Sequence, residues 1–124
     1  VGHLYKGEKS NSGYDDDKFW RSTRGYMSYQ LSNKNLEGKF LDITVLDELK
    51  LDNVEISINE KRADIISTEN KTIRINVEKM AVVDLKITST NEKPTPRFYQ
   101  IRILKENIQR RTSGKIPVNL ISEM

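Results

Sequence analysis

Hydrophobic and polar residues alternate with a period of two along much of the chain. Successive side chains of a β-strand point to opposite faces, so each alternating run predicts a strand with one buried face and one wet face. On this pattern Tyr29 and Tyr99 point inward. The runs that carry the alternation are residues 27–31, 41–45, 54–58, 73–77, 83–88 and 99–103.

Polar segments rich in turn-forming residues separate these runs. Pro94 and Pro96 bracket one of them and lack the amide proton that a strand ladder requires. No long segment carries a helical stripe of apolar residues. Short strands at regular spacing are typical of sandwiches and barrels. We therefore predict an all-β fold, an antiparallel two-sheet β-sandwich that is jelly-roll-like and has little helix.

The length of 124 residues fits one domain. A chain of this size buries about two thirds of its unfolded surface, which is enough for one core. The alternation stops after Lys105, so residues 1–105 are predicted to form the β-sandwich domain. Within it, residues 1–23 are polar and turn-rich and are expected to be surface loop with a short strand near residues 3–6. Residues 106–124 are predicted to be a C-terminal extension, either an edge strand or disordered chain.

The composition argues against catalysis. The chain has no cysteine and a single histidine, His3, so a zinc site lacks its ligands, and a Ser-His-Asp set that uses His3 is possible only in the sense that Ser and Asp are common. We expect no catalytic residues, no metal and no cofactor. The acidic run Asp15, Asp16 and Asp17 has the oxygens that calcium prefers but not the spacing of a calcium loop, which favours an exposed turn and leaves cation binding open.

Charge and hydropathy argue against a nucleic-acid partner and against a membrane span. The net charge is +3, and no aromatic residues interleave with Arg110 and Arg111 in the basic tail, as a nucleic-acid groove requires. We therefore expect no nucleic-acid partner. No run of about 18 apolar residues is present, so the sequence predicts no membrane span.

The aromatic residues near the first strong strand have two interpretations. Trp20 is the only tryptophan, and Tyr14 and Tyr26 lie on either side of it. Large aromatic rings often fill the edge of a core in a small domain. Exposed in a row, the same rings form a platform on which a sugar stacks. The sequence leaves both interpretations open for Trp20, Tyr14 and Tyr26.

The leading third of the chain resembles a known family. The pattern is Gly-Glu-x-Ser, Gly, aromatic-Arg and then Gly-x-aromatic-Ser-Tyr-x-Leu, which here is carried by residues 7–10, 13, 20–21 and 25–31. It is similar to the C-terminal β-sandwich accessory domain of bacterial β-L-arabinofuranosidase-like glycoside hydrolases of the Bacteroides type. The resemblance covers about residues 3–105 and is most specific in the first third.

The resemblance implies a non-catalytic accessory domain of a larger glycoside hydrolase. Its partner is then the catalytic domain of the same polypeptide, on which it packs or whose cleft it shapes, in the periplasm or outside the cell. The alternative is a carbohydrate-binding module that contacts polysaccharide through exposed Trp20, Tyr14 and Tyr26. In either case the catalytic residues belong to another domain of the resembled enzymes, so none is carried over to this chain.

The motif residues also have an expected structural role. We predict that Arg21 forms a charge-assisted pair with Glu8 and so fixes the leading segment to the sheet. Ser28 and Tyr29 are adjacent in a predicted strand and should point to opposite faces. Tyr29 then anchors the core while Ser28 meets solvent or a neighbouring domain.

Overall fold

The computed structural model describes residues 4–105 of the chain. Within this range no helix is long and apolar enough to cross a membrane, and the helical content is one short 3₁₀ turn, η1 (Lys34–Leu36). His3 and the C-terminal extension, with its predicted edge strand, lie outside the described residues. The strands are β1 (Leu4–Asp15), β2 (Lys18–Ser32), β3 (Phe40–Val45), β4 (Val54–Ile58), β5 (Lys61–Arg62), β6 (Ile65–Ser67), β7 (Thr72–Asn76), β8 (Val82–Ser89) and β9 (Phe98–Leu104).

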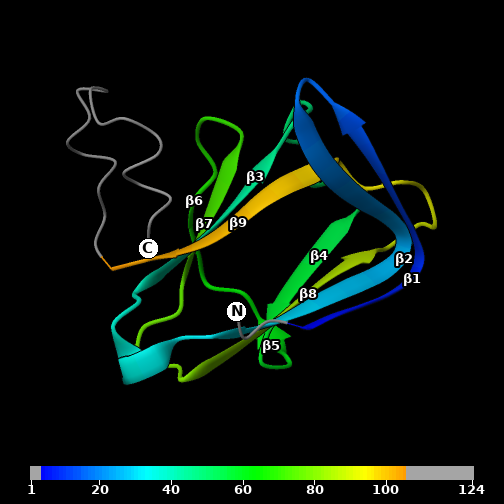
Figure 1. The fold of residues 1–124 in the computed structure, drawn as a ribbon. Coiled ribbons are helices and arrows are strands. Elements are labelled where there is room, and N and C mark those ends of the chain that lie inside the picture. Colours follow the sequence, from blue (N-terminus) through cyan, green and yellow to red (C-terminus); the bar gives the residue numbers. More distant parts are fainter. Residues whose placement is uncertain (1–3, 106–124) are drawn as a thin grey trace.

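The strands form one antiparallel sheet that curls on itself like half a barrel (Figure 1). The strand order is β5-β4-β8-β2-β9-β3-β7-β6, and β1 pairs with β2 outside this path. β2 pairs with β8 from Tyr26 to Ser32 but meets β9 only at the bridge between Arg21 and Phe98. The predicted all-β class is confirmed. The hydrogen bonds join the strands into one curled sheet, and its division into a two-sheet sandwich stays a prediction.

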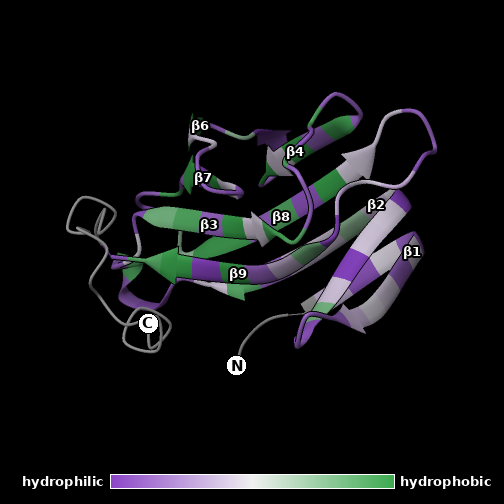
Figure 2. Ribbon diagram, turned by 90° about the horizontal axis from the view of Figure 1, so that it is seen from above, coloured by the Kyte–Doolittle hydropathy of each residue, from purple (hydrophilic) through white to green (hydrophobic). Residues whose placement is uncertain are grey.

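Apolar side chains from the two arms of the curled sheet meet in one core. Leu85 and Ile87 of β8 enter it from one arm, and Ile43 and Ile73 of β3 and β7 enter it from the other; all are fully buried. Hydrophobic and hydrophilic segments alternate along β8 in Figure 2, as a strand with one buried face requires. The other buried members of the cluster are Met27, Leu41, Val45, Ile56, Ile58, Ala63, Ile75, Val77, Val83 and Phe98.

The leading segment differs from the sequence prediction. Instead of a surface loop, residues 4–32 form the long β1–β2 hairpin, paired from Leu4–Gln30 to Asp15–Lys18. Alternation did not reveal β1 because its residues from Lys6 to Ser12 are exposed on both faces of the strand. Neither face therefore carries the apolar side chains that mark the buried side of a strand. By contrast, each alternating run of the sequence lies in a strand, within one residue at its ends.

β2 bends along its length (Figure 1), and we call residues 23–25, where its pairing with β1 shifts register, the corner. The pairing register shifts between Glu8 and Ser10 of β1, which is a β-bulge. The Thr23 hydroxyl accepts a hydrogen bond from the Gly25 amide at 2.9 Å and donates to the Glu8 carbonyl oxygen at 3.0 Å. A Cβ at Gly25 would lie 2.8 Å from that same oxygen, so the corner requires glycine.

An ion pair is buried on the face of the sheet opposite the core. Asp42 of β3 and Arg74 of β7 are cross-strand partners. Nε and Nη2 of Arg74 each donate at 2.7 Å to a different carboxylate oxygen of Asp42, and the two side chains are only 4% and 6% exposed. Because the pair is buried, removing one partner leaves a charge that is neither solvated nor balanced by the other.

We expect Asp42→Ala to lower the free energy of unfolding by about 3 kcal/mol, the usual cost of breaking a buried pair. Urea unfolding followed by far-ultraviolet circular dichroism measures this loss. The matched control is Asp52→Ala, at an exposed position, with an expected change below about 0.5 kcal/mol. Equal effects of the two substitutions would contradict a structural role for the buried pair.

Candidate functional site

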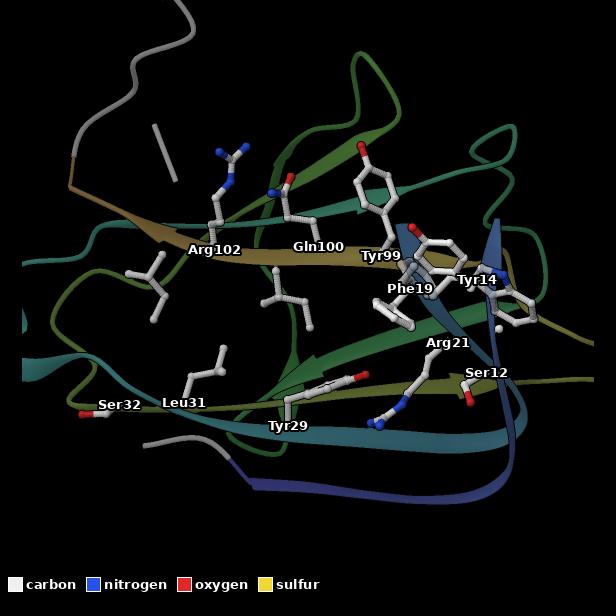
Figure 3. A pocket seen from close by; sticks show the side chains of 15 residues that line it. Ser12, Tyr14, Phe19, Arg21, Tyr29, Leu31, Ser32, Tyr99, Gln100 and Arg102 are labelled. Carbon is white, nitrogen blue, oxygen red and sulfur yellow. The ribbon is translucent and has the colours of Figure 1, made fainter. Parts of the chain in front are cut away.

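A groove opens where β2 and β9 diverge from their bridge at Arg21–Phe98. Its volume is about 900 Å³, and the two strands run along its sides in Figure 3. Leu31 and Ile103, which pack partly against the core, contribute apolar surface to it. The described residues that line the groove are Ser12, Gly13, Tyr14, Phe19, Trp20, Arg21, Tyr29, Leu31, Ser32, Phe98, Tyr99, Gln100, Ile101, Arg102 and Ile103.

Two exposed aromatic rings stand at the hairpin end of the groove. Tyr14 and Phe19 are cross-strand partners whose ring centroids lie 4.6 Å apart at a tilt of 53°. They are 55% and 78% exposed, although burial of such rings strongly stabilises a fold. Asp16 and Asp17 form the two-residue turn between the strands, with φ of 52° and 62°, as the favoured hairpin turn requires. The acidic run is therefore a turn that places the two rings side by side.

Trp20 is fixed to the hairpin and is not a free aromatic plate. Its Nε1 donates to Asp15 Oδ2 at 3.1 Å, and its ring leaves no room for a Cβ at Gly13. The Arg97 guanidinium carbon lies 5.3 Å from the ring centroid, in the range of a cation–π contact. The indole is partly buried and contributes one side of the groove.

Arg97 joins the hairpin to the loops at the same end of the molecule. Its backbone amide and Nε donate to Asp47 Oδ2 and Oδ1, each at 3.0 Å, and its Nη2 donates to Oδ1 at 2.6 Å. Its Nη1 donates to Asp15 Oδ2 at 2.8 Å. The hydrogen bonds from Arg97 hold the pKa of Asp47 below its ordinary value, although burial acts in the opposite direction. The loop before β9, the loop after β3 and the hairpin tip are thus linked through one guanidinium.

Arg21 and Tyr29 lie next to each other in the groove (Figure 3). The Arg21 guanidinium carbon is 3.6 Å from the Tyr5 ring centroid, and the rings of Tyr5 and Tyr29 are 5.1 Å apart. Burial raises the pKa of the Tyr29 phenol, and the neighbouring Arg21 opposes that rise. The predicted pair between Arg21 and Glu8 is wrong. Glu8 lies opposite Tyr26, beyond the bend, and its side chain is exposed.

Tyr26 and Ser28 lie on the other face of β2. They alternate with Met27 and Tyr29, which pack into or against the core, so the predicted opposition of Ser28 and Tyr29 agrees with the structure. Lys86 Nζ lies 4.8 Å from the Tyr26 ring centroid. Tyr26 does not line the groove, whereas the other two aromatic candidates do.

Sequence reasoning missed several residues of the groove. Phe19 stands as far from the two-residue turn as Tyr14 does, so recognising the acidic run as a hairpin turn finds it. Gln100 and Arg102 gave no signal, because the pattern marked them only as the wet face of a strand. Both side chains rise from β9 on the side away from β2 in Figure 3, and Arg102 has two buried nitrogens, Nε and Nη1, without a hydrogen-bond partner.

Two carboxylates near the groove, Asp15 and Asp47, are already used in the fold. Asp15 and Asp47 bind Arg97, and the lowered pKa of Asp47 is opposite to what a general acid requires. Residues 4–105 contain no group of three or more His, Cys, Asp or Glu side chains that could hold a metal ion. What the groove does present is ring faces and hydrogen-bond donors, which are the elements of a binding surface.

Comparison with known proteins gives a family but no activity. A family model described as a family of unknown function, DUF6805, matches residues 1–104. The match spans all nine strands and ends at the last residue of β9. No curated protein matches the chain.

Replacing Asp47 by Asn tests the Arg97 anchor. A lowered folded-state pKa means that the ionised carboxylate stabilises the fold above the ordinary carboxyl pKa of about 4 and that this contribution is lost as the pH falls through the folded-state value. We expect the melting temperature of Asp47→Asn to be a few degrees below that of the native chain at neutral pH. The two temperatures should converge in acid. Glu48→Gln, at an exposed neighbouring position, is the control. A gap that persists unchanged in acid would rule out an electrostatic anchor.

Proposed function

The chain belongs to the family of unknown function DUF6805 and, since membership assigns no activity, we propose its role from the groove between β2 and β9. The domain is a non-catalytic module of a larger carbohydrate-active polypeptide, and it binds polysaccharide in this groove. The observation that carries the proposal is the pair of exposed rings, Tyr14 and Phe19, at the end of an aromatic and polar groove.

The chemistry of the groove suits a sugar. A pyranose or furanose ring has apolar C–H faces and polar edges, so it binds where ring faces and hydrogen-bonding side chains lie together. Tyr14 and Phe19 supply ring faces, and Ser12 and the Tyr29 hydroxyl supply polar groups. The groove volume also lies within the range of about 300–1,000 Å³ that is usual for ligand sites.

We propose further that the curled sheet is a two-sheet sandwich of jelly-roll type. Two arms that face each other across a shared core, and a single β2–β9 bridge between them, support this division. The parent polypeptide is then a glycoside hydrolase similar to the β-L-arabinofuranosidase-like enzymes that residues 7–31 resemble. The setting is periplasmic or extracellular, where polysaccharide is encountered, and the catalytic domain of the same polypeptide is the second partner.

A second candidate function is packing alone, without sugar binding. It is favoured by β6, which ends the sheet and carries two adjacent isoleucines, Ile65 and Ile66, with 41% and 47% exposure. An exposed apolar edge strand favours burial against another domain. On this candidate β6 docks on the catalytic domain, and the isolated domain has no affinity for any polysaccharide.

We expect plant or mucin polysaccharides to change the fluorescence of Trp20, because this single tryptophan lines the groove. Loss of one stacking ring costs about 1 kcal/mol, so Tyr14→Ala and Phe19→Ala should each weaken binding about fivefold. Fluorescence titration with a panel of such polysaccharides, confirmed by affinity electrophoresis, measures the change.

Tyr26→Ala is the matched control, since it removes a partly exposed tyrosine of the same strand that lies outside the groove. It should bind as tightly as the native chain. Failure of the native chain to bind any polysaccharide of the panel would contradict the proposed sugar binding and favour the packing role. Loss of binding in Tyr26→Ala alone would move the site to the other face of β2.

A further inference from the structure

Arg21 is a guanidinium in the groove without an acidic partner. Arg97 and Arg74 each bind a carboxylate, whereas Arg21, which belongs to β2, forms no such ion pair with any residue that the structure describes. Across residues 4–105 no ion pair reaches Arg21, and its contacts are with the Tyr5 ring and Tyr29. The side chain is partly buried, so it has lost some of the water that otherwise solvates its charge.

The surroundings of Arg21 make the groove electropositive. Of the described residues that line it, none is Asp or Glu. Lys18 adds a further cation, with its Nζ 5.3 Å from the centroid of the Tyr99 ring on β9. Two acidic residues of the hairpin contact lining residues: Asp15 is bound to Arg97 and Trp20, and Asp17 accepts a hydrogen bond from the Tyr14 hydroxyl at 3.5 Å. The groove therefore complements a negative charge.

Arg21 is also held in place before any ligand arrives. The stacking on Tyr5 fixes the plane of the guanidinium, and Figure 3 shows the side chain extending within the groove toward Tyr29. A planar guanidinium that is oriented in advance loses little rotational freedom when it binds a carboxylate through two parallel hydrogen bonds. Arg102 also lines the groove but belongs to β9, whereas Arg21 belongs to the hairpin that carries the two exposed rings, so we assign the ligand's charge to Arg21.

We propose that the groove recognises a carboxylated sugar, such as the uronic acid units of an acidic polysaccharide, with Arg21 as the carboxylate ligand. The inference rests on the proposed function and specifies its substrate class. The exposed rings of Tyr14 and Phe19 and the cation of Arg21 are carried by the same hairpin, so one ligand with ring faces and a carboxylate engages both. The carboxylates of an acidic peptide could pair with Arg21, but such a peptide has no apolar ring face to stack on Tyr14 and Phe19.

The test compares polygalacturonate with its fully methyl-esterified form. Esterification keeps the sugar rings and removes the negative charge. A charge-assisted hydrogen-bonded pair accounts for about tenfold in affinity, so the native chain should bind the acid form about tenfold more tightly than the ester. Isothermal titration calorimetry at low and high salt measures both, and salt should weaken the binding of the acid form alone.

Variants then assign the effect to Arg21. Arg21→Gln should lower the affinity for the acid form to that for the ester and leave the ester affinity unchanged. Arg21→Lys keeps the charge but loses the planar fork, so it should restore only part of the preference. Arg24→Gln removes an exposed arginine of the same strand outside the groove and should bind like the native chain. If Arg21→Gln fails to fold, the comparison of acid and ester on the native chain decides alone.

The outcomes separate this inference from the proposed function. Equal binding of acid and ester contradicts carboxylate recognition while leaving polysaccharide binding intact. Absence of binding to both forms and to every neutral polysaccharide removes the proposed function itself. Tighter binding of polyglutamate than of polygalacturonate identifies an acidic polypeptide as the ligand and overturns the sugar assignment.

Discussion

The corner in β2 separates the part of this strand that lies inside the sheet from the part that projects as a hairpin. Thr23 exchanges backbone and side-chain hydrogen bonds with Thr95, at 3.1 and 3.0 Å, and its hydroxyl bridges Gly25 and Glu8. After the corner, β2 is an interior strand between β1 and β8; before it, β2 and β1 project as a hairpin. That hairpin meets β9 at one bridge only, and the groove is the space left between the diverging strands.

The two exposed rings proposed to bind sugar take no part in the contacts that stabilise the fold. The two arms are stabilised by apolar burial and, on one of them, by the bidentate pair of Asp42 and Arg74. The hairpin tip is fixed by polar contacts through Arg97. Neither set of contacts requires the rings of Tyr14 and Phe19. Both rings stay exposed, although burying them would stabilise the fold. Exposed rings on an anchored support are ready for a ligand, because little order has to be gained on binding.

The sequence predicted the strands that have one buried face and missed those that have none. Period-two alternation located β3, β4, β7, β8 and β9 because each places apolar residues on the core. Alternation did not locate β1, because a strand whose residues are exposed on both faces has no regular apolar positions. Of the three aromatic candidates, Trp20 and Tyr14 line the candidate groove and Tyr26 does not.

The parts of the site that the sequence did not predict depend on long-range geometry. Whether Arg21 pairs with Glu8 depends on the hairpin register, which places Arg21 opposite Ser12 and Glu8 opposite Tyr26. The groove itself depends on how far β2 and β9 separate after one bridge, and no local residue pattern encodes that distance. Charge composition was equally uninformative, because the net charge of +3 does not reveal a groove without acidic residues.

Mapping the bound ligand on the backbone tests whether the groove between β2 and β9 is the binding surface. In a titration of the ¹⁵N-labelled chain with oligogalacturonate, we expect amide shift changes concentrated at residues 12–14, 19–21 and 99–103. The amides of β4 and β6, which lie away from the groove, should stay in place. Shift changes centred on β6, or spread evenly over the molecule, would contradict the account.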